Sequence, residues 1–263
     1  MTKKPKSDYA IQTVSNALRL LEMFEGEERL GVTELSRRLD LHKNNVFRLL
    51  ATLEQSGYIE QCAEDDQYRL AVACLELGHS YVSSNSLLDR ARPALERLSA
   101  EVGETTHVGV ARGDEVAHLD GVLPDQVLVT SLRLGSRLPL HATALGKTLL
   151  GFASEERREA FDRDRIAAGL EARTPATLVD RAKLLDELRA AAAQGFAVEI
   201  EECEPGMVCA AAPVHDASGA VVAAISVSAP TVRVSEDDLH RRVVPAVVAA
   251  AADLSRQIGF QAA

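Results

Sequence analysis

Two short amphipathic helices joined by a tight turn are the feature that most constrains the start of this chain. Apolar residues recur at helical spacing over 33–39 and again over 42–56, and only residues 40 and 41 separate the two patterns. Thr33 is a suitable N-cap for the first of these helices. Two helices joined by so short a turn are typical of a helix-turn-helix, whose second helix enters the major groove of DNA.

A further helix and a pair of short strands complete a larger unit around this motif. The same spacing predicts a core-facing helix over 13–24, and strands are predicted over 58–61 and 67–70 on either side of an acidic turn, as in a β-wing. We therefore expect a winged helix-turn-helix domain over 13–70, preceded by a flexible arm over 1–12. A small helical bundle with a solvated polar face is the alternative, because helix pairs of this kind are common.

The outward side of the second helix carries side chains suited to reading DNA. Asparagine presents a paired donor and acceptor that match adenine, and arginine grips guanine through two hydrogen bonds. Lysine and the first amides of a helix can hold phosphate. The predicted DNA-contacting residues are Thr33, Lys43, Asn44, Asn45, Phe47 and Arg48.

The charge of the chain argues against DNA binding by bulk attraction, because the formal net charge is -10. Residues 1–70 carry 10 Lys and Arg against 12 Asp and Glu, whereas residues 71–263 carry 19 against 27. Most of the acidity therefore lies in the second part of the chain, and a local basic face on the first domain is compatible with these counts.

Composition also excludes several classes of protein. No apolar run reaches the roughly 20 residues that cross a bilayer, and the N-terminus is polar, so we expect a cytoplasmic protein with no membrane partner. The four cysteines lie far apart without a CxxC pair, and the histidines offer no ligand spacing. We therefore expect no disulfide framework, no metal and no cofactor.

The rest of the chain is predicted to form a linker helix and a second domain of α+β class. An apolar helical stripe over 71–86 indicates a linker that could pair with its counterpart in a second copy, and strand and helix patterns then fill 87–263. Strands are predicted over 106–110, 116–121, 126–132, 197–200, 207–215 and 221–228, and helices over 87–102, 142–152, 155–168, 180–194 and 235–258.

Three segments bring the chain close to a known family. Residues 35–54 with the helix-turn-helix, residues 139–147 (PLHATALGK) and residues 195–228 (GFAV to AISVS) resemble segments of the IclR family of transcriptional regulators. They occur in the family's order and with its spacing, and together they cover nearly the whole chain. The resemblance implies a C-terminal, GAF-like effector domain with a central antiparallel sheet flanked by helices.

The chain departs from the family pattern at several positions. Glu199 stands where the family usually has Asp, and Ile200 takes the next acidic position. Asn44 and Asn45 replace a pair of hydroxyl residues. The first two changes bear on the class of effector, and the third predicts an operator sequence of its own.

The resemblance also implies a pocket for a small organic or aromatic acid in the second domain. Free amides at the start of the helix near residue 142 favour an anion, and Ser226 and Ser228 alternate so that both hydroxyls share one face of a strand. Our hypothesis is a carboxylate held by amides and hydroxyls, with Glu199 accepting a hydrogen bond at the other end. The predicted effector-binding residues are Ala144, Leu145, Glu199, Met207, Cys209, Ser226 and Ser228.

Several of these residues also have a purely structural interpretation. The two serines could be strand residues bonded to their neighbours. Glu199 could be a solvated edge charge or part of an ion pair, and Cys209 could be a small buried hydrophobe. These alternatives stay open at the level of the sequence.

We expect a sequence-specific transcriptional regulator, a repressor rather than an activator, whose affinity for a double-stranded DNA operator changes when the acid binds. One winged domain buries too little surface to find a unique site, so a homodimer or homotetramer is expected. The alternatives are a metabolite sensor, or a thiol-based enzyme that uses Cys209 with His141 and Glu199, without a role on DNA. Nothing in the sequence brings those three side chains together, so we expect no enzyme.

Overall fold

The computed structural model describes residues 10–84, 86–126 and 130–261. The chain divides into two compact units, Met1–Ser84 and Asn85–Ala263, and each has a hydrophobic core of its own. The division falls at the break between two helices.

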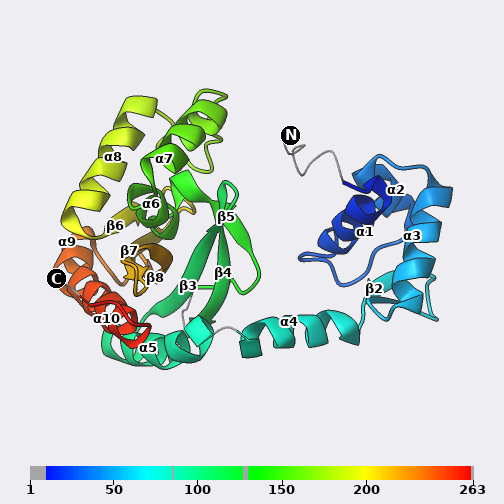
Figure 1. Ribbon diagram of the computed structural model, residues 1–263, viewed down its shortest axis with the longest axis horizontal. Helices are drawn as coiled ribbons and strands as arrows, with labels where there is room; N and C mark the ends of the chain where they lie inside the picture. The colour runs from blue at the N-terminus through cyan, green and yellow to red at the C-terminus, as the bar shows by residue number, and fades with distance from the viewer. Residues whose placement is uncertain (1–9, 85, 127–129, 262–263) are drawn as a thin grey trace, which may run out of the picture. The chain divides into compact units, whose positions relative to one another are not determined.

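The N-terminal unit packs three helices against a two-stranded wing, and a fourth helix follows (Figure 1). Its core brings together Leu20, Leu35, Val46 and Leu50, which come from the first three helices. The predicted core face of the first helix is partly wrong, because Val14 and Leu18 are exposed. The elements are α1 (Gln12–Glu22), α2 (Val32–Leu39), α3 (Lys43–Gln55), β1 (Ile59–Gln61), β2 (Tyr68–Leu70) and α4 (Val72–Ser84).

The tight turn between α2 and α3 is closed by the backbone and by one side chain. Asp40 ends α2 in the left-handed region, with φ 53°, which aspartate tolerates better than most residues. The Ser36 hydroxyl donates to the Leu41 carbonyl at 2.6 Å, and the Leu41 amide donates back to the Ser36 carbonyl at 3.1 Å. The predicted helix-turn-helix is therefore present.

The predicted N-cap of α2 is wrong. The helix begins at Val32, its N-cap is Gly31, and Thr33 lies exposed in the first turn. The chain enters the helix early because Leu30 is already fixed to the wing: its amide donates to the Tyr68 carbonyl at 2.9 Å.

The C-terminal unit is built around one six-stranded sheet. Its strands are β3 (Thr105–Arg112), β4 (Glu115–Val122), β5 (Arg137–Pro139), β6 (Ala197–Ile200), β7 (Met207–His215) and β8 (Val221–Pro230). Its α-helices are α5 (Ser86–Val102), α6 (Ala144–Gly151), α7 (Glu155–Phe161), α8 (Arg181–Gln194), α9 (Glu236–Asp238) and α10 (Val244–Gln257).

The strands run in the order β5-β4-β3-β8-β7-β6, and every neighbouring pair is antiparallel. Helices α5 and α10 cover one face, and α6 with α7 and α8 lies on the other (Figure 1). Strand alternation separates the two faces, so that Ile225 and Val227 of β8 enter the core beneath α5 and α10 while Ser226 and Ser228 point the other way. The predicted fold class, α+β with a central antiparallel sheet, is confirmed.

The predicted strand over 126–132 is not found among the residues that the structure describes. Gln126 and residues 130–132 have no strand structure, and residues 127–129 lie outside the described part of the chain. The edge strand is β5 instead, which pairs with β4 through Arg137↔Ala117. Of the apolar residues in the predicted strand, Leu132 lies beside Gly121 of β4, where a Cβ would be 2.9 Å from its Cδ1.

Candidate DNA-binding surface and effector pocket

Helix α3 turns a polar and basic face outward. Val46, Leu49 and Leu50 are buried, which fixes the rotation of the helix about its axis. The six residues predicted to contact DNA are exposed, five of them on this helix and one on α2: Thr33, Lys43, Asn44, Asn45, Phe47 and Arg48.

The start of α3 is electrostatically suited to an anion. His42 is its N-cap, with Nδ1 accepting from the Asn44 amide at 3.3 Å, and no acidic residue occupies the first turn. The positive end of the helix dipole is therefore not screened by a carboxylate of its own. The sequence placed His42 inside the helix and missed its capping role.

Four arginines of the N-terminal unit form ion pairs within it: Arg29, Arg37, Arg38 and Arg69. Arg38 contacts Glu34 at 2.6 Å and Glu27 at 2.7 Å, and the two arginines beside Glu34 lower the pKa of that carboxyl to about 2. Arg29 contacts the acidic turn of the wing. By contrast, Lys43 and Arg48 form no ion pair with any residue that the structure describes. Lys43 and Arg48 are therefore the cations of α3 that are available to phosphate or base edges.

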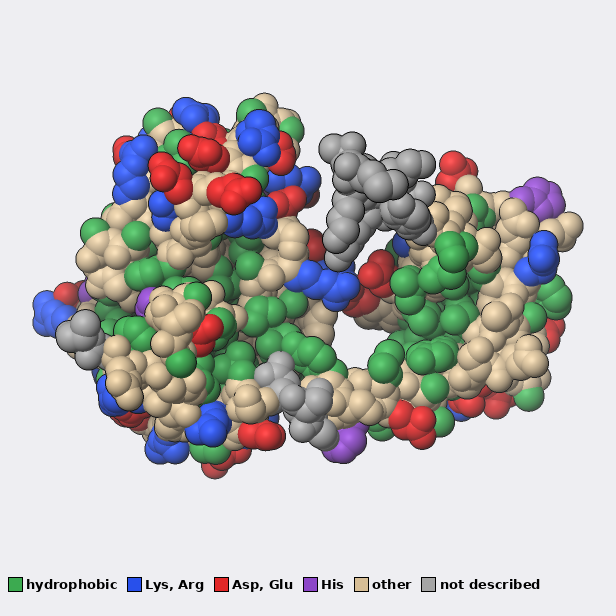
Figure 2. Space-filling view, in the orientation of Figure 1, with side chains coloured by type: hydrophobic (Ala, Val, Ile, Leu, Met, Phe, Trp, Pro, Cys, Tyr) green, Lys and Arg blue, Asp and Glu red, His purple; other side chains and the backbone are tan. Residues whose placement is uncertain are grey.

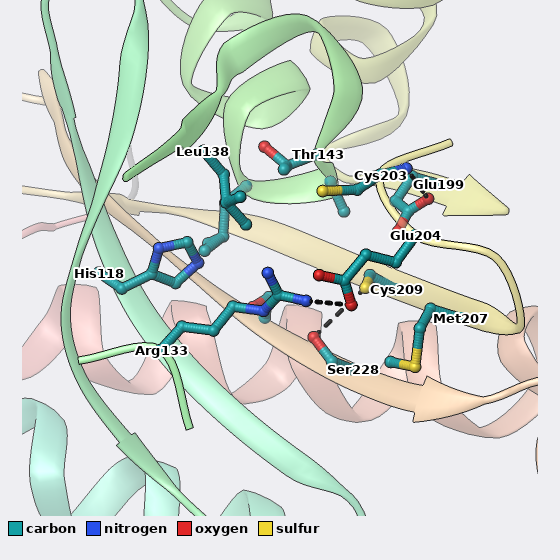
Figure 3. Close-up of a pocket in the computed structure, with 13 residues that line it drawn as sticks. His118, Arg133, Leu138, Thr143, Glu199, Cys203, Glu204, Met207, Cys209 and Ser228 are labelled. Atoms are coloured by element: carbon teal, nitrogen blue, oxygen red, sulfur yellow. Dashed lines mark hydrogen bonds and ion pairs between the residues drawn. The ribbon is translucent and has the colours of Figure 1, made fainter. Parts of the chain in front are cut away.

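A pocket lies between the sheet and the start of α6 (Figure 3). All seven predicted effector-binding residues line it, although they come from four separate elements or turns. The full lining is His118, Arg133, Leu138, Thr143, Ala144, Leu145, Glu199, Cys203, Glu204, Met207, Cys209, Ser226 and Ser228.

The floor of the pocket is a row of polar side chains set by strand register. Glu199 of β6 lies opposite Cys209 of β7, which lies opposite Ser228 of β8. The Cys209 thiol donates to the Ser228 hydroxyl oxygen at 3.3 Å. Since that oxygen already accepts, the Ser228 hydroxyl proton is available for an acceptor in the pocket.

Glu199 is neither a solvated edge charge nor half of an ion pair among the described residues. Its side chain is 2% exposed, and Oε2 accepts from the amides of Glu202 at 2.9 Å and Cys203 at 3.4 Å. Burial raises the pKa of this carboxyl to about 7. Glu199 therefore braces the turn after β6 and exists in both protonation states near neutral pH.

The start of α6 presents its first amides to the pocket. Thr143 is the N-cap, and its Oγ1 accepts from the Gly146 amide at 3.0 Å. The amides of Ala144 and Leu145 belong to the first turn, where no helical carbonyl precedes them. Gly146 allows this helix to lie on the preceding turn, because a Cβ there would be 2.2 Å from the Leu140 carbonyl oxygen.

Six pocket residues were not anticipated from the sequence: His118, Arg133, Leu138, Thr143, Cys203 and Glu204. His118 shares an inward face of β4 with Val116, so the alternation of that strand was a usable signal. His118 Nδ1 lies 3.3 Å from the Ser136 carbonyl, which can only accept, so Nδ1 carries the proton. Burial lowers the pKa of His118 to about 4, and its Nε2 is then an acceptor.

The catalytic alternative finds no support in the geometry. The Cys209 thiol donates to Ser228, and burial raises its pKa well above the ordinary value, which disfavours the thiolate. His141 Nε2 instead lies 3.0 Å from the Glu171 carbonyl oxygen, and His141 does not line the pocket.

Both units of the chain match models of one protein family. Residues 13–62 match the model of the IclR helix-turn-helix domain, and residues 79–256 match that of the bacterial transcriptional regulator IclR C-terminal domain. The chain belongs to the IclR family of transcriptional regulators. Among IclR relatives, the HTH-type transcriptional regulator XynR of Escherichia coli (strain K12) is 36% identical over 96% of this chain and 99% of its own length. The HTH-type transcriptional repressor AllR of the same strain is 32% identical over 89% and 86%.

Solved IclR structures share the fold of the whole chain. An IclR transcriptional regulator from Alicyclobacillus acidocaldarius superposes with a TM-score of 0.85 at 25% identity, covering 95% of this chain and 100% of the other. An IclR homolog from Microbacterium hydrocarbonoxydans, complexed with 4-hydroxybenzoate, superposes with a TM-score of 0.77 at 24% identity, covering 93% and 99%. As a member of the IclR family, the protein is a DNA-binding transcriptional regulator and not an enzyme. No helix in the described part of the chain is long and apolar enough to cross a membrane.

Proposed function

We propose that this IclR-family regulator represses transcription by placing α3 in the major groove of a double-stranded operator. The observation that carries the proposal is the exposed face of α3, where Asn44, Asn45 and Arg48 stand beside Lys43 at the start of the helix. Repression, rather than activation, agrees with the name of its relative AllR. Action on chromosomal DNA implies the bacterial cytoplasm.

The proposed signal is a small carboxylic acid bound in the C-terminal pocket. The first amides of α6 and the Ser228 hydroxyl are donors to a carboxylate. His118 Nε2 and the half-ionised Glu199 are acceptors for a hydroxyl elsewhere on the molecule. Because donors and acceptors are both present, a hydroxy acid fits the pocket better than a plain fatty acid.

A homodimer is the proposed binding unit, and a homotetramer is the next larger possibility. The N-terminal unit exposes an apolar surface on α1 and α4, visible as a gathering of apolar side chains in Figure 2. Contiguous exposed apolar surface of this kind marks a protein interface, and a second copy would cover it symmetrically. The exposed fractions are Ile11 66%, Val14 53%, Leu18 58%, Val72 65% and Leu75 73%.

Fluorescence anisotropy tests the DNA-binding surface, with a labelled duplex from the region upstream of the protein's own gene. Arg48→Ala is expected to weaken binding by about 1–3 kcal/mol, that is, by roughly fivefold to 150-fold, and to relax the preference for one base pair. Arg241→Ala removes an equal charge from an exposed, Asp237-paired arginine of the other unit and is the control. Equal affinities of wild type and Arg48→Ala would remove α3 from the interface.

Thermal unfolding tests the effector class. Glycolate, glycerate, malate and 4-hydroxybenzoate are compared with glycolamide and 4-hydroxybenzamide, which lack the negative charge. An acid at about 100 times its dissociation constant stabilises the protein by about 2.7 kcal/mol, and hence raises the melting temperature by roughly 5–10 °C, while its amide does not. Melting temperatures and DNA affinities that no acid changes would refute the proposed signal.

A further inference from the structure

The pocket is lined by a half-buried arginine whose role is not explained by the fold. Arg133 is 16% exposed, and its Nη2 lies 2.6 Å from Glu204 Oε2. Figure 3 shows the two side chains reaching toward each other over the floor formed by Cys209 and Ser228. A guanidinium stays charged at any physiological pH, so it needs an anion wherever it is removed from water.

The two partners differ in how easily they can leave the contact. Glu204 is 42% exposed, so it can turn into water at little cost, whereas Arg133 is largely enclosed by the pocket. The Glu204 side chain is also not what holds its turn: Glu201 Oε1 accepts from the Gly206 amide at 2.9 Å, and Glu199 Oε2 accepts from the Glu202 amide. Glu204 can therefore be replaced by another carboxylate without dismantling the turn.

The other groups around Arg133 do not compensate its charge. His118 is neutral, with a pKa lowered to about 4, and burial raises the pKa of both Cys203 and Cys209, which keeps the thiols protonated. Glu199 is only partly ionised near neutral pH. When Glu204 turns away, the pocket is left with a positive charge that one small anion can neutralise.

We propose that Arg133 binds the carboxylate of the effector, and that Glu204 occupies this place while the pocket is empty. This inference rests on the proposed function and adds the charged partner that helix amides and hydroxyls, as neutral dipoles, do not supply. An arginine can hold a carboxylate through two parallel hydrogen bonds. Effector binding then exchanges one carboxylate for another, and Glu204 competes with the effector.

This competition predicts that substituting Glu204 and substituting Arg133 change the affinity for carboxylates in opposite directions. Glu204→Gln keeps the shape of the side chain but removes the competing charge, so carboxylates bind more tightly. Arg133→Gln removes the binding group, so they bind less tightly. A pair with a purely structural role would give the same direction for both substitutions, because losing either partner breaks the same contact.

Thiol alkylation measures how readily a small carboxylate enters the pocket. The natural effector need not be known, because iodoacetate is itself a small carboxylate. A thiolate displaces iodide from its methylene carbon, so that the S–C bond forms, the C–I bond breaks and the thiol proton passes to buffer. Cys203 lines the pocket, and Cys62, in the other unit, is an internal reference. Iodoacetamide, the neutral isostere, corrects for changes in thiol reactivity and in general accessibility.

The quantity to compare is the ratio of iodoacetate to iodoacetamide labelling at Cys203, read by peptide mass spectrometry. Glu204→Gln is expected to raise the ratio about tenfold, which corresponds to 1.4 kcal/mol, and Arg133→Gln to lower it below that of wild type. Arg133→Lys, which keeps the charge, recovers most of the wild-type ratio. The ratio at Cys62 stays constant in all variants, and a circular dichroism spectrum and melting temperature close to those of wild type show that the C-terminal unit of each variant is folded.

A ratio at Cys203 that does not change, or that moves the same way in Glu204→Gln and Arg133→Gln, overturns the role of Arg133. This failure differs from failure of the proposed function. If malate or 4-hydroxybenzoate alters DNA binding equally in wild type and Arg133→Gln, the effector pocket stands and Arg133 has no part in it.

Discussion

Replacing Gly146 by alanine is expected to destabilise the C-terminal unit and to disturb the pocket at the same time. The new Cβ would lie 2.2 Å from the carbonyl oxygen, 2.4 Å from the Cα and 2.6 Å from the carbonyl carbon of Leu140. All three are backbone atoms, so no side chain can rotate out of the way. Since real Cβ contacts are not found below 3.0 Å, α6 and the Leu140 turn must separate by at least about 0.8 Å.

The energetic result is a balance of two opposing terms. Overpacking of this kind costs about 1–3 kcal/mol, and the better helix propensity of alanine returns at most about 1 kcal/mol. A net loss of about 1–2 kcal/mol is expected. The amides of Ala144 and Leu145 belong to the displaced turn, so acids that stabilise wild type should stabilise the variant less.

Urea denaturation followed by two probes locates the effect. All four tyrosines precede residue 85 and the chain has no tryptophan, so tyrosine fluorescence follows the N-terminal unit while circular dichroism follows both. Gly146→Ala should shift the transition of the C-terminal unit, which circular dichroism detects and tyrosine fluorescence does not. The tyrosine transition should stay in place. Gly78→Ala in α4, where nothing lies within 4 Å of the added Cβ, is the control and should stabilise by up to about 1 kcal/mol. A Gly146→Ala protein as stable as wild type would refute the packing argument.

Three other substitutions probe the buried charges and the proposed subunit interface. Glu199→Gln should remove a pH dependence of the free energy of unfolding. Because the pKa of Glu199 is raised from 4.5 to about 7 in the folded protein, this group stabilises the fold fully below pH 4.5, and its contribution of roughly 3 kcal/mol is lost as the pH rises through 7. Equal slopes of unfolding free energy against pH for the two proteins would contradict this prediction. Lys147→Met should lower the free energy of unfolding in urea by about 3–5 kcal/mol. The Nζ atom of Lys147, which is 1% exposed, lies 2.5 Å from Glu202, so the substitution would leave that carboxylate buried without its cation. Adding Glu202→Gln should recover part of the loss, and no recovery would argue against the pair. Leu75→Glu should shift the sedimentation coefficient toward a monomer and weaken operator binding roughly tenfold or more, and an unchanged oligomer would exclude this face from the interface.

Much of the architecture follows from patterns that are local in the sequence. The spacing of apolar residues predicts the helices around Val46 and Leu50, and alternation in β7 and β8 separates pocket residues from core residues. Both patterns report which side of one element faces the interior. The five predicted pocket residues on β6, β7 and β8 meet for this reason, since the register of the sheet brings their strands together, and the start of α6 supplies the other two.

Contacts between distant, irregular segments could not be predicted in this way. Arg133 follows a segment whose apolar alternation suggested a strand, and Glu204 lies in a turn 71 residues later, so no periodicity connects them. The Gly31 cap of α2 was missed because it depends on Leu30 pairing with the wing. In each case the interaction that fixes the structure joins two distant segments, and no periodic pattern in the sequence connects them.

The opposite orientation of neighbouring residues in β8 has a consequence for how such a regulator can change over time. Ile225 and Val227 serve the core that the fold requires, whereas Ser226 and Ser228 face the pocket. If the pocket binds the effector as we propose, a mutation at either serine can alter which acid is bound while leaving the core intact. Regulators that share this fold can in this way come to respond to chemically different effectors.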